Sequence, residues 1–324
     1  IYIFQGSVGF SFWEDKIDMA GIANFHTIFN IAVTIIFIPF TKLLEKLAMM
    51  TFPDNTSDEE GSAEAIGMAS LNNLDDLLMK SPSLAIQQST ITAVNMGKIA
   101  LYNFRKTLSL FKEYNPKLVE KLNENETNID RMEDRLNAYL VKLTECELSE
   151  AESHRVTVLL HLTSEFERIG DYTMNLIEVA AKMNAVNLNF SENAIKELQV
   201  IAGAVEEIIT MAVDTVENND ANLAYKIEPL EETIDFLNET LKAKHIERLK
   251  AGKCNVEVGV NFLDMLINLE RISDHCSNVA VYIIGGQTMA GIIFNHHDYI
   301  KDAHKGVNEE YTSLYNEFMH KYSV

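Results

Sequence analysis

Cysteine is scarce in this sequence, and its few cysteines are not arranged as a cross-link or a metal site. Cys146, Cys254 and Cys276 lie far apart in the 324-residue chain, and none belongs to a CxxC pair. A disulfide framework or a zinc finger needs closer, regular spacing. We therefore expect three small, buried, apolar side chains in a reducing compartment.

The short motifs of common hydrolases and nucleotide-binding enzymes are also missing. The sequence contains no GxxxxGKS or GxxxxGKT loop, no GxSxG elbow and no HExxH helix, which would supply a phosphate cradle, a serine nucleophile or a catalytic zinc. A ferritin-like di-iron oxidase needs two Glu-x-x-His motifs from different helices, and the sequence has one, from Glu317 to His320. We expect that the protein is not an enzyme.

Positive charge is in short supply. Lysine and arginine together number 27, whereas aspartate and glutamate number 48, and the formal net charge at pH 7 is −21. Such a chain repels the phosphates of DNA and RNA, so we expect no nucleic-acid partner. The excess carboxylates either form a hydrated surface or supply hard oxygen ligands for cations.

One segment near the start carries no formal charge. Residues 21–40 read GIANFHTIFNIAVTIIFIPF, and twenty helical residues are long enough to cross the hydrocarbon core of a bilayer. We expect a transmembrane helix here; the alternative is a buried helix of a water-soluble protein. His26, Asn30 and Thr34 recur at intervals of four and share one helical face, which would contact protein or water rather than lipid.

The segments on either side of this helix suggest how the N-terminal part is organised. The chain opens with Ile1 inside an apolar stretch, and we interpret residues 1–48 as the end of a longer membrane domain. Lys42 and Lys46 follow the uncharged segment, and this basic bias places its C-terminal side in the cytoplasm. Residues 49–80 contain proline, glycine and an acidic run without an apolar period, so they are predicted to be a linker.

From residue 81 onward the pattern is that of long helices in a bundle. Capping residues mark helix starts near residues 82, 116, 149 and 191. Apolar residues recur every seven positions, as in helices packed side by side; they include Leu122, Ile129, Leu136 and Leu143. We predict an all-α fold with two three-helix bundles, over residues 81–190 and 191–324, the second of which includes a C-terminal helix.

The two predicted bundles carry the same motif. Residues 167–175 read ERIGDYTMN and residues 270–278 read ERISDHCSN, so E-R-I-x-D-x-x-x-N occurs twice, 103 residues apart. A second shared pattern, ExxID, begins at Glu126 and again at Glu231. Two copies of one three-helix unit explain both observations.

Each motif gathers carboxylates on one helical face. A glutamate and an aspartate four residues apart repel each other on an isolated helix. A divalent or trivalent cation would offset this repulsion, and so would an ion pair with the arginine that each motif contains. We predict two cation sites, to which the preceding helix also contributes a pair of carboxylates. The predicted ligands are Glu167, Asp171, Glu126 and Asp130 in the first copy and Glu270, Asp274, Glu231 and Asp235 in the second.

The duplicated motif on a tandem three-helix repeat resembles the PhoU family of phosphate-regulatory proteins. The resemblance covers about residues 83–285 and implies that the glutamate and aspartate of each motif bind a metal cluster. The metal would be iron, manganese, magnesium, zinc or calcium, among which oxygen-rich sites discriminate weakly. Glu133 in the first copy corresponds to Asn238 in the second, so we expect that the two sites need not be equally occupied.

The N-terminal part resembles a further family. FHTIFN at residues 25–30, followed by IPF at 38–40, is similar to the last conserved helix of the bacterial sodium/phosphate cotransporters related to Na/Pi cotransporter II. Residues 74–78 and 82–85 are similar to the junction before the PhoU-like tail of that family. The transport sites of the family lie in repeated Gln-Ser-Ser segments, which this sequence lacks, so the resemblance assigns no transport residue here.

Together these resemblances imply a cytoplasmic, metal-binding PhoU-like domain that regulates a sodium:phosphate symporter in a bacterial plasma membrane. Inorganic phosphate and sodium would be partners through the upstream transport domain, and a homo-oligomer is compatible with the pattern. The alternative is a soluble all-helical scaffold or interaction protein of phosphate signalling that has no transport activity.

Overall fold

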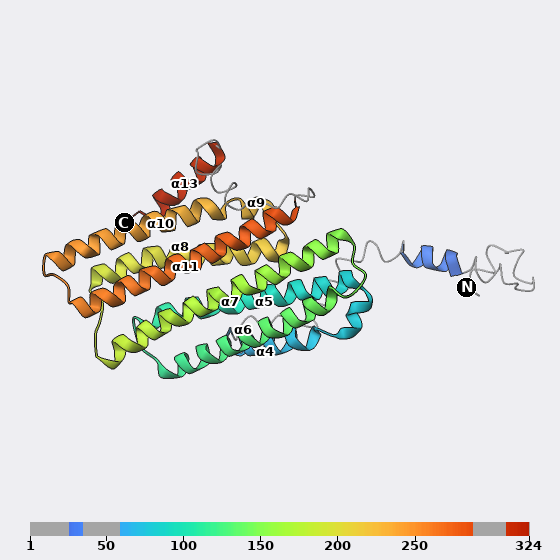
Figure 1. Ribbon diagram of the computed structural model, residues 1–324, viewed down its shortest axis with the longest axis horizontal. Helices are drawn as coiled ribbons and strands as arrows, with labels where there is room; N and C mark the ends of the chain where they lie inside the picture. Colours follow the sequence, from blue (N-terminus) through green and yellow to red (C-terminus); the bar gives the residue numbers. More distant parts are fainter. Residues whose placement is uncertain (1–25, 35–58, 288–308, 324) are drawn as a thin grey trace, which may run out of the picture. The chain divides into compact units, whose positions relative to one another are not determined.

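The structure is a computed structural model that describes residues 26–34, 59–287 and 309–323 (Figure 1). Every regular element within these ranges is helical, which confirms the predicted all-α class. The chain divides into two compact units, Ile1–Glu59 and Glu60–Val324.

In the first unit, residues 26–34 form a helix. Asn30 Nδ2 lies 3.2 Å from His26 Nδ1, and Thr34 Oγ1 donates a 2.8 Å hydrogen bond to the carbonyl of Asn30. The three polar side chains therefore share one face, as predicted. No helix in the described part of the chain combines the length and the apolar character that a membrane span requires. The structure thus does not support the predicted span over 21–40, most of which lies outside the described residues.

The second unit contains the two predicted three-helix bundles (Figure 1). The first bundle consists of α5 (Pro82–Leu110), α6 (Pro116–Leu143) and α7 (Glu150–Ala185). The second consists of α8 (Glu192–Asn218), α10 (Ile227–Lys250) and α11 (Val256–Gln287), with the short helix α9 (Ala221–Ala224) between α8 and α10. The helices of each bundle pack on one another, and the bundles meet where α7 packs on α11 and α5 packs on α8.

Local capping interactions explain where several of these helices begin. The side chain of Asn115 accepts hydrogen bonds from two backbone amides in the first turn of α6. Ser149 and Glu152 form a reciprocal capping box at the start of α7, and Ser191 caps α8. Each cap satisfies amides that have no partner inside the helix. The predicted helix starts near residues 116, 149 and 191 are confirmed.

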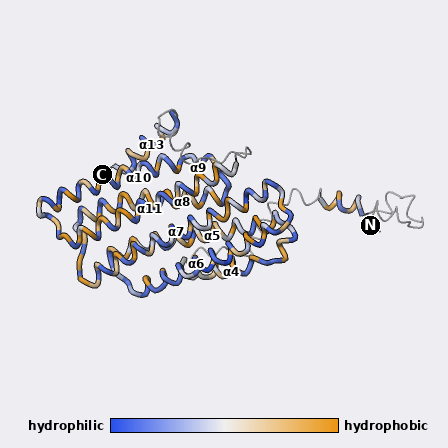
Figure 2. Tube along the Cα trace, viewed as in Figure 1, coloured by the Kyte–Doolittle hydropathy of each residue, from blue (hydrophilic) through white to orange (hydrophobic). Residues whose placement is uncertain are grey.

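Most of the core is one set of apolar side chains that spans both bundles, and a smaller cluster around Leu122 lies within the first bundle. Figure 2 shows hydrophobic and hydrophilic residues alternating along the helices, as amphipathic packing requires. Gly97 of α5 lies close to side chains of α7 and α8: an added Cβ would lie 2.7 Å from the ring of Phe166 and 2.9 Å from Val213. Cys276 is buried in this core as expected, whereas the other two cysteines are partly exposed.

The structure differs from the predicted linker over 49–80. Helix α4 (Glu59–Asn73) and the 3₁₀ helix η2 (Asp76–Lys80) occupy most of it from residue 59 onward. Ala63 and Leu74 are buried as part of the main core. The apolar side of α4 consists largely of small residues, so its sequence shows little periodicity although the helix packs on the bundle.

The predicted C-terminal helix is present as α13 (Glu309–Lys321). It packs on α10, and Phe318 inserts into the common core. The hydroxyl of Tyr311 donates a hydrogen bond to the Glu232 carboxylate on α10. Because Glu232 follows Glu231 directly, α13 lies beside the carboxylates of the second bundle.

Candidate metal centre

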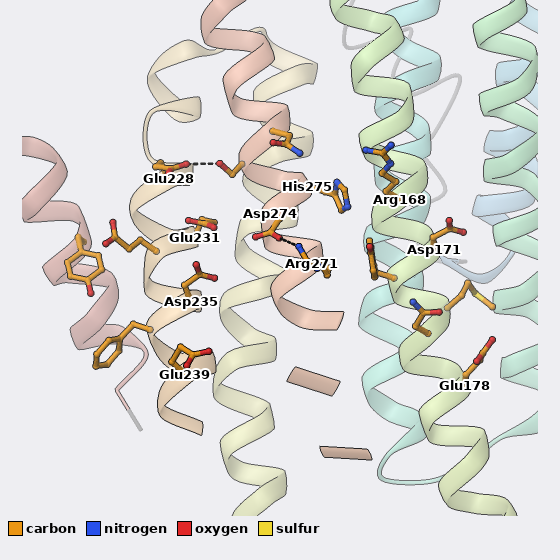
Figure 3. A pocket seen from close by; sticks show the side chains of 18 residues that line it. Arg168, Asp171, Glu178, Glu228, Glu231, Asp235, Glu239, Arg271, Asp274 and His275 are labelled. Carbon is orange, nitrogen blue, oxygen red and sulfur yellow. Dashed lines mark hydrogen bonds and ion pairs between the residues drawn. The ribbon is translucent and has the colours of Figure 1, made fainter. Parts of the chain in front are cut away.

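Three predicted ligands of the second copy converge in space. Glu231 and Asp235 lie one turn apart on α10, and Asp274 lies on the antiparallel helix α11. Each has a carboxylate oxygen within 4.8 Å of the other two. Figure 3 shows the three carboxylates facing one another along a groove of about 1350 Å³. Within the described ranges, no other group of three such side chains comes this close together.

The electrostatics of this group favour either bound protons or a bound cation. Burial, followed by the charges of Glu228, Asp235 and Asp274, raises the pKa of Glu231 to about 9. Burial, followed by the charge of Glu270, raises the pKa of Asp235 to about 6. Burial also raises the pKa of Asp274, although its Arg271 neighbour opposes the shift. Carboxylates that repel and desolvate one another in this way are stabilised by a positive ion.

Glu270, the fourth predicted ligand of this copy, is held by other partners. Its Oε2 atom lies 3.2 Å from the ammonium of Lys242 and also accepts a hydrogen bond from the amide of Asn238. Both partners come from α10. Glu270 therefore stands beside the group of three and is already paired with a cation of the protein. Lys242 was not among the residues predicted from the sequence, although it follows Asp235 by two helical turns.

The predicted ligands of the first copy form a looser cluster around Glu126. This side chain is 9% exposed, and both of its carboxylate oxygens lack a hydrogen-bond partner in the described structure. Burial, followed by the charges of Asp130, Asp171 and Glu167, raises its pKa to about 8. An unpaired buried carboxylate is costly, so this group needs a proton or a cation.

A glycine makes room for the carboxylate of Glu126. A Cβ at Gly170 would lie 2.9 Å from Glu126 Oε2, whereas the second copy has Ser273 at the equivalent position. Glu167 completes the first cluster: burial, followed by the charges of Asp171 and Glu133, raises its pKa to about 7. The charge of Glu133 therefore adds to the negative charge of this cluster, whereas the second copy has the neutral Asn238 at the equivalent position.

The asparagine that ends each copy of the motif links the two bundles instead of pointing a ligand at the acidic clusters. Asn175 donates a 3.0 Å hydrogen bond to Asn268, and Asn278 donates a 3.0 Å hydrogen bond to Glu165. Residues 165 and 268 are 103 positions apart, as are 175 and 278, so the contact is reciprocal.

The contact surface between α7 and α11, here called the seam, also brings two equivalent aromatic residues together. Tyr172 and His275 are also 103 positions apart, and their rings stack with centroids 5.4 Å from each other. His275 Nδ1 lies 2.7 Å from Glu165 Oε2. Glu165 is buried and faces α11 from a position outside the motif, which is why the motif alone did not reveal it.

The arginines of the motifs behave differently in the two copies. Arg271 Nη1 donates a 3.1 Å hydrogen bond to Asp274 Oδ2, so the ion-pair alternative holds in part for the second copy. Arg168 lies 3.8 Å from Glu165, the residue of the seam, rather than beside a predicted ligand. Glu228 is a further carboxylate of the groove that sequence analysis missed; it accepts a hydrogen bond from Ser277 and lies one turn before Glu231.

Comparisons with known proteins agree with the duplicated architecture. A family model described as the PhoU domain matches residues 93–180 and 198–283, one stretch in each three-helix bundle. The crystal structure of PhoU from Pseudomonas aeruginosa superposes with a TM-score of 0.59 at 18% identity, covering 64% of this chain and 97% of that one. This likeness confirms the PhoU-like fold.

Relatives with curated names are distant in sequence. The phosphate-specific transport system accessory protein PhoU homolog of Xylella fastidiosa is 21% identical over 215 residues, which are 65% of this chain and 90% of that protein. PhoU homolog 1 of Thermotoga maritima is 24% identical over 137 residues, 41% of this chain and 58% of that protein.

A longer relative matches more of the chain. YjbB of Escherichia coli, which is named as an inorganic phosphate export protein, is 20% identical over 265 residues. The match covers 81% of this chain but 47% of YjbB, so the chain spans about half the length of that relative. With a PhoU domain model matched in both bundles and a PhoU fold, the chain belongs to the PhoU family.

Proposed function

We propose that this chain is a metal-binding accessory module of inorganic phosphate transport and signalling, with no catalytic or transport activity of its own. Membership of the PhoU family supports this function, because the curated relatives include proteins named as accessory proteins of phosphate-specific transport systems. The single observation that carries the metal-binding part is the convergence of Glu231, Asp235 and Asp274 from two helices within 4.8 Å.

The residues present suit a hard cation. In the second copy, Glu231, Asp235 and Asp274 would hold it. In the first copy, the ligands would come from four carboxylates: Glu126, Asp130, Glu167 and Asp171. Carboxylate oxygens suit magnesium, calcium, manganese and ferric iron better than ions that prefer sulfur. When bound, such an ion would supply positive charge that joins α10 to α11 and α6 to α7. The metal content of the cell would thereby set how firmly the helices of each bundle are held together.

Metal analysis of the purified protein tests this proposal. The full chain is stripped with a chelator, reloaded with Mn²⁺ and assayed for bound metal after gel filtration. We expect Asp171→Asn and Asp274→Asn each to lose one class of bound Mn²⁺, and the double variant to lose both. Glu178→Gln is the matched control, because Glu178 lines the same groove but pairs with Lys182. Unchanged stoichiometry in the double variant would rule out these ligands.

A second candidate function keeps the module in one polypeptide with a sodium-coupled phosphate carrier. It is favoured by the match to YjbB, which covers most of this chain but 47% of that longer protein, and by the resemblance of residues 25–40 to sodium/phosphate cotransporters. The partners would then be a bacterial plasma membrane, inorganic phosphate and sodium, with the PhoU bundles in the cytoplasm.

Phosphate flux separates the two candidates. Cells that express the natural gene are compared with cells that express it without residues 59–324, in sodium and in potassium buffer. A sodium-dependent flux that loses its response to external phosphate after the deletion supports the attached module. An identical flux in both strains would contradict it and favour a module that acts on a separate carrier.

A further inference from the structure

The two acidic clusters differ in the positive charge that the protein itself provides. In the second cluster, the ammonium of Lys242 lies 3.2 Å from Glu270 and 3.1 Å from Glu239. The guanidinium of Arg271 lies 3.1 Å from Asp274. Two cations of the chain therefore touch carboxylates of the second cluster.

The first cluster lacks both contacts: Arg168, the equivalent of Arg271, lies beside Glu165 instead, and the equivalent of Lys242 is neutral. The helix offset that equates Glu126 with Glu231 also equates Asn137 with Lys242. Asn137 donates a 3.4 Å hydrogen bond to Glu133, and Glu133 itself replaces the neutral Asn238. Lys242 of the second copy therefore corresponds to a neutral amide in the first, and Asn238 of the second copy corresponds to a carboxylate in the first.

The two clusters also differ in the sign of the charges that act on their carboxyl groups. The charged groups that perturb the pKa values of Glu126, Asp130 and Glu167 are all carboxylates. In the second cluster, by contrast, Lys242 lowers the pKa of Asp235, partly offsetting the effect of burial. The first cluster consequently demands positive charge from outside the chain more strongly than the second.

Each cluster also contains a buried side chain whose oxygen has no hydrogen-bond partner among the described residues. Glu126 is 9% exposed and has no hydrogen-bond partner for either oxygen in the described structure. Asn238 donates its amide to Glu270, but its Oδ1 atom is buried without a partner in the same part of the chain. An oxygen that is free to accept a further bond thus lies at each cluster.

We propose that Lys242 is a built-in counter-ion that competes with metal at the second cluster, so that the first cluster binds metal tightly and the second exchanges it. This inference rests on the metal-binding function proposed above. Lys242 is 25% exposed, so its ammonium can turn towards Glu239 and solvent when a metal enters. The second site would then respond to changes in free metal concentration while the first stays loaded.

Reciprocal substitutions test the inference. Lys242→Asn gives the second copy the residue of the first, and Asn137→Lys does the opposite. Each change is made in an Asp171→Asn background and in an Asp274→Asn background, so that the two sites are measured one at a time. Binding of Mn²⁺ to the full chain is followed by electron paramagnetic resonance of the free ion. Lys250→Asn, an exposed lysine at the end of the same helix, controls for the change in net charge.

We expect the two sites to differ in affinity by at least about tenfold, since a unit charge at hydrogen-bond distance in a half-exposed site has an effect of this order. Lys242→Asn should tighten the second site about tenfold, and Asn137→Lys should weaken the first by a similar factor. Lys250→Asn should change either affinity less than about twofold. Lys242→Gln repeats the test if the asparagine variant folds poorly.

The possible failures are distinguishable. Equal affinities at the two sites, or an unchanged second site in both Lys242 variants, would overturn the role of Lys242 and leave metal binding intact. Absence of Mn²⁺ binding in every protein, including the unsubstituted chain, would instead overturn the proposed metal-binding function.

Discussion

The stability of the metal-free protein should fall as the pH rises, and the buried carboxyl of Glu126 is one of the groups that cause this. Burial and three neighbouring carboxylates raise its pKa from 4.5 to about 8 in the folded protein. Between these values the folded state binds a proton more tightly than the unfolded chain. The free energy of unfolding therefore decreases as the pH rises through this window, and it levels off above the folded-state pKa.

The size of the effect follows from the same pKa values. At about 1.4 kcal/mol per pH unit, a change from 4.5 to about 8 gives an upper limit of about 5 kcal/mol. Glu167 and Asp130 titrate in the same cluster and share the protons. We therefore expect Glu126 to account for a loss of about 2–3 kcal/mol between pH 5 and pH 8.

Glu126→Gln isolates this contribution, because the amide has the same shape and stays neutral. Urea denaturation in the presence of a chelator gives the free energy of unfolding at pH 5, 6.5 and 8 by linear extrapolation. At pH 8 the variant should be more stable than the unsubstituted protein by about 2 kcal/mol, and at pH 5 the two should be nearly equal. Glu124→Gln, an exposed residue of the same helix, should leave the pH profile unchanged.

Two results would refute this reasoning. The unsubstituted, metal-free protein could become more stable from pH 5 to pH 8, or Glu126→Gln could retain the full slope. The first would mean that the folded protein stabilises its carboxylates as anions, and the second would mean that the pH dependence arises from groups other than Glu126. Mn²⁺ at pH 8 should remove most of the destabilisation in the unsubstituted protein, because a bound cation favours the deprotonated carboxylates.

Two further predictions concern packing. Gly97→Ala should lower the free energy of unfolding by about 1–3 kcal/mol, because its Cβ would meet the Phe166 ring at 2.7 Å. Gly203→Ala, whose Cβ would lie 3.8 Å from Tyr322, should instead stabilise by up to about 1 kcal/mol in the same denaturation assay; a reversed order would contradict the close approach of α5. Phe318→Ala should strip α13 of amide protection in hydrogen exchange while the bundles keep theirs, since it removes the one buried side chain of that helix; equal loss of protection throughout would show that α13 and the bundles unfold together.

Helix starts were predictable because the interactions that set them are local. Asn115, Ser149 and Ser191 each cap a helix within a few residues of sequence, and such contacts do not depend on the rest of the fold. Helix α4 was missed for the opposite reason. Its burial of Ala63 depends on the surface that the other helices offer, and small residues leave little periodic signal.

The candidate site was predictable in composition but not in pairing. Spacing by four placed Glu231 and Asp235 on one face of α10, and the repeat indicated that a second helix would meet them. The sequence does not reveal that Glu270 pairs with Lys242, because that contact depends on the register between α10 and α11. The sequence also does not reveal that Glu165 accepts a hydrogen bond from Asn278, because that contact depends on how one bundle packs on the other.

The reciprocal seam between the bundles has a consequence for how the duplicated halves can diverge and move. Asn175 and Asn278 each reach across to the opposite copy, while Tyr172 and His275 meet each other at the centre. Each of these central residues directly follows an acidic residue of its own motif. Because these contacts join α7 to α11 at equivalent positions, a tilt of one helix would shift the other. The acidic clusters of the two bundles are therefore mechanically coupled through this contact surface.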